Sequence, residues 1–291
     1  MKKLALLVPA ILVFSFNIVV SAQQSPQSKQ KETVVAYEIA GMNDVIVRRD
    51  IPYLESSDSA LKMDVYYPPG FDFKRRIPAI VIVFGYTNEG QLKTAKHQLR
   101  TWSAYTSWCR VIAASGMAAI VYETNEPEND LKSLMRYINS ETDNLLIDLD
   151  KIGAYSCSAN TPTEMAYLLN DPECIFECAV AYYGIFLTPD FKYLTTIDSL
   201  SQNMGFVTPR LAESASWNKT VPLMIVHAGK DLVLLTESLT SFVSEAIVQN
   251  IPVTLIIHSD GIHAFDLYTD NESTRQIIRN TLEFWKFHLN K

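Results

Sequence analysis

The sequence lacks an excess of positive charge. Its 25 lysine and arginine residues are outnumbered by 32 aspartate and glutamate residues, so the formal net charge is −7 at pH 7. Nucleic acids and anionic membrane surfaces are themselves negative and attract basic proteins. We therefore expect no nucleic-acid partner and no electrostatic binding to a membrane surface.

Cysteine and histidine are also scarce, with four and five residues respectively. Cys174 and Cys178 have the spacing of half a metal site, but no second pair of cysteines or histidines completes it. We therefore expect no bound metal. Together with Cys109 and Cys157, these residues allow three complete disulfide pairings, and the sequence does not choose among them. Structural thiols or one disulfide are the two expectations.

Long apolar runs are missing after residue 22, so no later segment is suited to cross a membrane. At the start, Lys2 and Lys3 precede an apolar stretch from Leu4 to Val20, and small residues end at Ala22. This order predicts a cleaved secretory signal peptide at residues 1–22, although the stretch approaches the length of an uncleaved membrane anchor. Cleavage removes two lysines and no acid, which takes the charge from −7 to −9. We expect an exported protein, periplasmic or secreted.

The remaining sequence predicts one domain. Residues 23–33 are polar, contain a proline and are typical of a linker, whereas residues 34–291 contain alternating apolar runs and helical patterns without an internal repeat. A hydrophobic content of 48% is enough for a large core. Strands are expected near residues 45–49, 61–67, 77–85, 117–122, 152–155, 179–183, 222–227 and 253–257, and helices near residues 99–115, 131–147, 163–169, 236–248 and 272–289.

This alternation predicts an α/β fold with a mostly parallel, doubly wound sheet of about eight strands and helices on both faces. The first strands are expected to be antiparallel. The connection at residues 185–220 is the longest between two expected strands and mixes aromatic with polar residues. A connection of this length usually has a function, so we expect a lid or one wall of a pocket.

Two serines, Ser156 and Ser158, lie in the turn that follows the strand at residues 152–155. Ligands of parallel α/β sheets bind beyond the carboxyl ends of the strands, and a serine nucleophile there needs a tight turn between small residues. With Ser158 as nucleophile, the strand extends to Cys157 at a normal length and Pro162 falls in the first turn of the next helix. Ser158 is the predicted nucleophile, Ser156 is the alternative, and a helix cap is the ordinary role of such a turn.

A serine nucleophile requires a base, and the base requires an orienting carboxylate. Asp231 and His263 each follow an apolar strand directly, so both are expected at the same edge of the sheet as Ser158. The sequence therefore predicts Asp231 as the acid and His263 as the base. Asp260 is a rival acid because it lies close to His263 in the chain, although a neighbour in the same loop rarely has the required geometry.

These motifs resemble the α/β-hydrolase superfamily, and within it the dienelactone-hydrolase-like and prolyl-oligopeptidase-like esterases and peptidases. The run Asp148-Leu-Asp-Lys-Ile-Gly153 resembles the stretch before the nucleophile of that family, Gly-Lys-Asp231 its acid, and His263-Ala-Phe its base. The usual Gly-x-Ser-x-Gly pattern differs, because Ser156 and Asn160 replace the two glycines. The resemblance implies the α/β-hydrolase fold.

An oxyanion hole would need two donors held in advance. One is expected from the backbone N–H of Ala159, and the other from Tyr86 by its backbone N–H or phenol, with Thr87 as the alternative. The family often has His-Gly before this position, where this chain has Phe84-Gly85.

Together these residues predict an exported serine hydrolase that cleaves small-molecule carboxylic esters through an acyl-enzyme, without a cofactor. A prolyl-oligopeptidase-like peptidase and a catalytically impaired hydrolase-fold binding protein are the alternatives. The sequence determines neither the acyl and alcohol specificity nor the oligomeric state.

Overall fold

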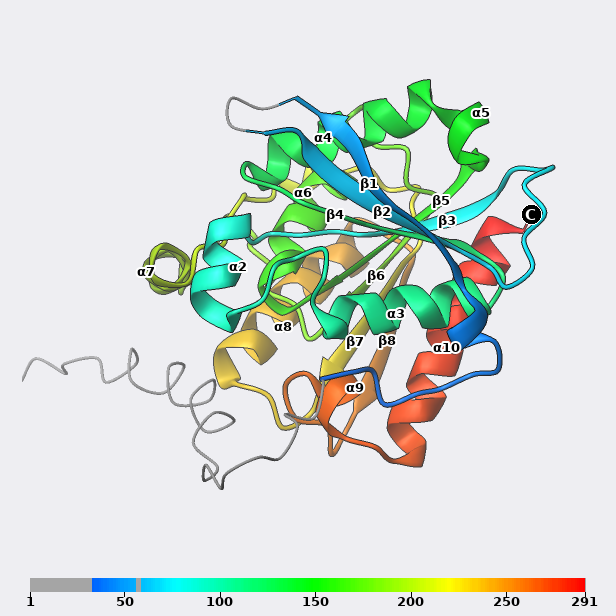
Figure 1. Cartoon of the computed structure of the whole chain (residues 1–291). Helices are drawn as coiled ribbons and strands as arrows, with labels where there is room; N and C mark the ends of the chain where they lie inside the picture. The colour runs from blue at the N-terminus through cyan, green and yellow to red at the C-terminus, as the bar shows by residue number, and fades with distance from the viewer. Residues whose placement is uncertain (1–32, 56–58, 291) are drawn as a thin grey trace, which may run out of the picture. The chain divides into compact units, whose positions relative to one another are not determined.

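The computed structural model describes residues 33–55 and 59–290 (Figure 1). The predicted signal peptide and all of the predicted linker except Thr33 lie outside the described residues. Within the described ranges, no helix is long and apolar enough to cross a membrane.

One eight-stranded sheet with the strand order β1-β2-β4-β3-β5-β6-β7-β8 forms the centre of the domain. Strands β1 and β2 pair antiparallel with each other, β2 pairs antiparallel with β4, and all further neighbours are parallel. The predicted fold class is confirmed. The strands are β1 (Ile46–Leu54), β2 (Leu61–Tyr67), β3 (Ile77–Ile82), β4 (Ala118–Tyr122), β5 (Ile147–Cys157), β6 (Cys178–Tyr182), β7 (Leu223–Ala228) and β8 (Val253–His258).

Helices cover both faces of the sheet (Figure 1). On one face, α3 (Ser103–Ala114) packs on β2 and β4, and α10 (Glu272–Leu289) packs on β5, β6 and β8. On the other face lie α4 (Pro127–Ser140), α6 (Thr161–Asn170) and α8 (Val233–Val248). The remaining helices are short or peripheral: α2 (Asn88–Ala95), α5 (Thr142–Leu145), α7 (Leu194–Met204), α9 (Phe265–Tyr268) and the 3-10 turns η1 (Met42–Asp44), η2 (Ser158–Asn160) and η3 (Ser214–Ser216).

Several expected boundaries differ from the observed ones, and three of them concern the strands next to the site. The helix expected over residues 131–147 ends at Ser140, and a further helical turn, α5, ends at Leu145, because the next residue, Leu146, has a left-handed φ of 53°. Strand β5 therefore begins at Ile147, which pairs with Ile77 of β3. Strand β3 ends at Ile82 rather than at Gly85.

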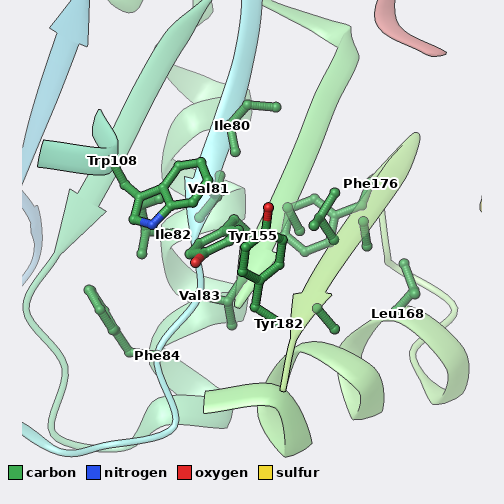
Figure 2. Close-up of a cluster of buried hydrophobic side chains, with 14 of the residues drawn as sticks. Ile80, Val81, Ile82, Val83, Phe84, Trp108, Tyr155, Leu168, Phe176 and Tyr182 are labelled. Carbon is green, nitrogen blue, oxygen red and sulfur yellow. The ribbon is translucent and has the colours of Figure 1, made fainter. Parts of the chain in front are cut away.

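The centre of the sheet is buried on both faces, which fixes the strand ends that carry the site. Figure 2 shows Trp108 of α3 close to Tyr155 of β5 and Tyr182 of β6, with the run Ile80 to Phe84 beside them. The ring centroid of Trp108 lies 4.8 Å from that of Tyr155 and 5.7 Å from that of Tyr182. A buried side chain of this size contributes about 2–3 kcal/mol through removal of apolar surface from water.

Candidate active site

A sharp turn at the end of β5 presents Ser158. Its φ of 54° lies in the left-handed region, which costs a residue other than glycine about 1–2 kcal/mol. The Ser158 carbonyl accepts hydrogen bonds from the N–H groups of Thr161 and Ile185, the latter at 3.3 Å, which offsets part of this cost. Helix α6 follows at once, with Pro162 in its first turn.

Ser158, His263 and Asp231 form a continuous chain of hydrogen bonds. The Ser158 Oγ lies 2.8 Å from His263 Nε2, and His263 Nδ1 lies 2.8 Å and 3.0 Å from the two carboxylate oxygens of Asp231. Because a carboxylate faces Nδ1, we assign the imidazole proton to Nδ1, which leaves the lone pair of Nε2 to accept the Ser158 hydroxyl proton. The side chain of Asp231 is fully buried, whereas that of His263 is 31% exposed.

The loops that carry Asp231 and His263 are joined to each other by backbone hydrogen bonds. The N–H of Gly229 donates to the carbonyl of His258, and the N–H of Lys230 donates to that of Gly261, each at 2.8 Å. A Cβ at Gly229 would lie 2.5 Å from the carbonyl oxygen of Ser259, so the close approach requires glycine. The two loops therefore hold the acid and the base at a fixed separation.

The alternative residues occupy other places. Asp260 is largely exposed and pairs with Lys230 at 3.0 Å, whereas the Nδ1 of His263 bonds to Asp231. Ser156 is buried, and its hydroxyl donates to Glu164 Oε2 at 2.6 Å on α6. Burial raises the pKa of Glu164 to about 8, so the hydroxyl of Ser156 faces a neutral carboxyl inside the protein at neutral pH.

The segment after β3 is held by backbone hydrogen bonds to the end of the long connection. The carbonyl of Gly85 accepts from Val207 N–H at 2.8 Å, and Thr87 N–H donates to the carbonyl of Gly205 at 3.2 Å. In this antiparallel pattern the residues in between, Tyr86 and Phe206, form a non-hydrogen-bonded pair. The N–H of Tyr86 therefore points away from residues 205–207. The backbone N–H of Tyr86 is thus not used by that pairing.

Thr87, the alternative donor, is used elsewhere, since its side chain accepts from the N–H of Gly90 and caps α2. The phenol ring of Tyr86 is buried against Phe206, with the ring centroids 5.5 Å apart. Burial raises the pKa of this phenol, so it stays protonated at neutral pH. Ala159, the other predicted donor, directly follows Ser158 in η2.

A buried carboxylate behind His263 was not anticipated from the sequence. Asp266 Oδ1 accepts from the hydroxyl of Tyr183 at 2.6 Å, and its Oδ2 accepts from the indole N–H of Trp108 at 2.8 Å. The Tyr183 ring in turn lies edge-on to the imidazole of His263, with the centroids 4.8 Å apart. Burial raises the pKa of Asp266. The sequence signal that could have indicated it is an acidic residue three positions after His263, next to Phe265.

The described residues contain no cluster of three or more histidine, cysteine, aspartate or glutamate side chains that could hold a metal ion. Cys109, Cys157 and Cys174 carry free thiols. Of the two expectations for the cysteines, the structure therefore favours structural thiols.

The chain is similar in structure to solved proteins. No protein-family model and no curated protein matches the chain. A thermophilic esterase of Thermogutta terrifontis superimposes with a TM-score of 0.63 at 18% identity, over 84% of this chain and 92% of that one. MGS-M1, an α/β-hydrolase enzyme from a Medee basin deep-sea metagenome library, gives 0.61 at 16% identity, over 85% and 99%.

A butyrate-bound form of the Thermogutta esterase gives a TM-score of 0.61 at 17% identity, over 86% of this chain and 97% of that one. Another form of that esterase is phosphonylated by sarin. These likenesses, with the strand order and the turn at Ser158, show that the chain has the α/β-hydrolase fold. The dienelactone-hydrolase-like subfamily stays a prediction.

Proposed function

We propose that this protein is a serine hydrolase that cleaves carboxylic esters. The observation that carries the proposal is the hydrogen-bonded chain from the Ser158 Oγ through His263 to Asp231, with 2.8 Å between the hydroxyl oxygen and Nε2. The three residues come from three loops at the carboxyl ends of β5, β7 and β8, where parallel sheets bind their ligands.

In the proposed reaction, the Ser158 Oγ attacks the ester carbonyl carbon while His263 Nε2 takes the hydroxyl proton. Asp231 stabilises the imidazolium that results. Collapse of the tetrahedral intermediate breaks the bond to the alkoxy oxygen, which takes the proton from His263 and leaves as an alcohol. Water then attacks the acyl-enzyme by the same route, releases the carboxylic acid and restores the Ser158 hydroxyl.

The negative charge on the carbonyl oxygen would be stabilised by the backbone N–H groups of Ala159 and Tyr86. The first directly follows the nucleophile, and the second points away from the paired segment at residues 205–207. Removal of one such donor typically lowers kcat by about 10² to 10³. No cofactor is needed for this chemistry.

We propose esters instead of peptides as substrates because the fold neighbours include esterases, one of them with butyrate bound. A small-molecule ester with a short acyl chain is therefore the first substrate to test. The apolar stretch from Leu4 to Val20, followed by small residues up to Ala22, supports export to the periplasm or beyond. N-terminal sequencing of the exported protein should then give Gln23 as the first residue.

The proposed activity is tested with p-nitrophenyl acetate and butyrate, beside a chromogenic dipeptide, on the purified protein and on Ser158→Ala. We expect ester turnover that falls by about 10³ or more in the variant, because the nucleophile is lost. A fluorophosphonate probe should label the protein at Ser158. Turnover of the dipeptide alone would favour a peptidase. If the protein showed no turnover and no labelling, a binding role would be left for the fold.

A further inference from the structure

Asn160, which stands where the usual pattern has glycine, uses its side chain in the interior. The residue is only 2% exposed, and its Oδ1 accepts a hydrogen bond from the N–H of Gly85 at 2.8 Å. Its Nδ2 donates to the hydroxyl of Tyr105 at 3.1 Å. Its φ of −82° is an ordinary helical value, so this backbone position does not require glycine.

The first of these hydrogen bonds joins the two segments that supply the proposed oxyanion donors. Gly85 lies against the turn so closely that a Cβ on it would be 2.5 Å from the carbonyl oxygen of Ala159 and 3.0 Å from the Cα of Asn160. Asn160 directly follows one donor, Ala159, and its side chain holds the residue before the other donor, Tyr86.

The hydrogen bonds of Gly85 determine the direction of the Tyr86 N–H. The Gly85 carbonyl and the Tyr86 N–H belong to one planar trans peptide unit and point in opposite directions. Val207 fixes this unit from the carbonyl side, and Asn160 fixes the preceding unit through the Gly85 N–H. Since glycine has little conformational preference of its own, both bonds are needed to hold it in one conformation.

We propose that Asn160 is a positioning residue for the oxyanion hole. Its side-chain amide holds Gly85 so that the N–H groups of Tyr86 and Ala159 converge on the carbonyl oxygen of the substrate. The inference rests on the proposed ester hydrolysis. It predicts that the departure from the glycine pattern contributes to catalysis instead of weakening it.

Two variants and one control test this role. Asn160→Ala removes the acceptor, and Asn160→Gly supplies the glycine of the usual pattern. Tyr105→Phe removes the other buried hydrogen bond of the same side chain and leaves the bond to Gly85 in place. Each protein is assayed for kcat and KM on p-nitrophenyl butyrate, for thermal unfolding, and for affinity toward a trifluoromethyl ketone, whose adduct with Ser158 carries the tetrahedral oxyanion.

We expect both Asn160 variants to lower kcat by about 10- to 100-fold, less than complete loss of a donor, with little change in KM. Affinity for the trifluoromethyl ketone should fall by a similar factor, because it shares the oxyanion with the transition state. Tyr105→Phe should keep kcat and this affinity near their wild-type values.

Wild-type or higher kcat in Asn160→Gly would overturn the inference. Loss of thermal stability with unchanged kcat, or failure of both Asn160 variants to fold, would overturn it as well and assign the side chain to stability. Absence of any Ser158-dependent turnover in the wild-type protein is a different result, since it would remove the proposed function itself.

Discussion

Asp266 is a single residue on which a buried group of hydrogen bonds depends. Its two oxygens accept from Trp108 and Tyr183, and Tyr183 contacts the ring of His263. Asp266→Ala removes the acceptor of the short hydrogen bonds from Trp108 and Tyr183, each at a cost of about 1–3 kcal/mol, and of a longer one from Tyr155 at 3.5 Å. We therefore expect the free energy of unfolding to fall by roughly 2–6 kcal/mol, measured by urea denaturation.

The matched control is Asp260→Ala, since Asp260 forms only an exposed ion pair with Lys230. Such pairs contribute about 0–1 kcal/mol, so this variant should unfold at nearly the wild-type urea concentration. Equal losses in the two variants would show that the buried bonds of Asp266 are not what stabilises this region.

Glu164 makes the stability of the folded protein depend on pH. Its pKa is raised from 4.5 to about 8 by burial, so between these pH values the folded protein keeps a proton that the unfolded chain releases. Stability due to this group is therefore complete below pH 4.5 and decreases as the pH rises, by about 1.4 kcal/mol per pH unit, until about pH 8.

Glu164→Gln removes this titration and keeps an oxygen that accepts from Ser156. Urea unfolding is measured at pH 5, 6.5 and 8. As the pH rises, the free energy of unfolding of the variant should increase relative to that of the wild type by a few kcal/mol. The neighbouring thiols of Cys157 and Cys174 do not interfere, because burial raises the pKa of each to about 12. A difference between the proteins that is constant with pH would contradict this origin.

The residues of the candidate site divide clearly by what the sequence could predict. Ser158, Asp231 and His263 were predicted because each follows its own strand, which is a local signal. The roles of Asn160 and Asp266 depend on partners 75 and 158 residues away, Gly85 and Trp108, so no local pattern contains them.

Helices α2 and α7 meet through two glycines. A Cβ at Gly90 would lie 2.0 Å from the carbonyl oxygen of Gly205, which ends α7 with a φ of 77°. Gly90→Ala therefore forces the two backbones apart and strains the bonds that flank Tyr86. We expect a loss of about 1–3 kcal/mol in stability and a clear drop in kcat on p-nitrophenyl butyrate.

Gly70→Ala is the control, because Gly70 has a φ of 67° and no atom near its missing Cβ. Its strain should cost about 1 kcal/mol and leave kcat unchanged. If Gly90→Ala kept full kcat, the contact between the helices would have no influence on the proposed oxyanion donor at Tyr86.

Element boundaries were predicted well where apolar runs are isolated and poorly where they adjoin. The strand Leu61–Tyr67 and the helix Glu272–Leu289 match the sequence prediction at both ends. The helix expected over residues 131–147 was predicted to end too late, at the first residue of β5, because Leu145 and Ile147 continue its apolar pattern. Helix α7 lies within the expected lid or pocket wall at residues 185–220, and residues 205–207 directly after it form the backbone hydrogen bonds to the segment around Tyr86.

At the scale of the domain, the fold class could be predicted from the order of strands and helices, because alternating elements with both faces of the sheet buried have few other arrangements. Substrate specificity could not be predicted in the same way. It depends on loops after the strands, whose shape follows from contacts between distant segments such as residues 85–87 and 205–207.

The free thiols have a kinetic consequence for a chain that folds in an oxidising solution. Burial raises the pKa of Cys109, Cys157 and Cys174, so little reactive thiolate forms once the protein has folded. The unfolded chain has no such protection. In such a solution, the core must therefore close around these side chains before an oxidant or another thiol reacts with them.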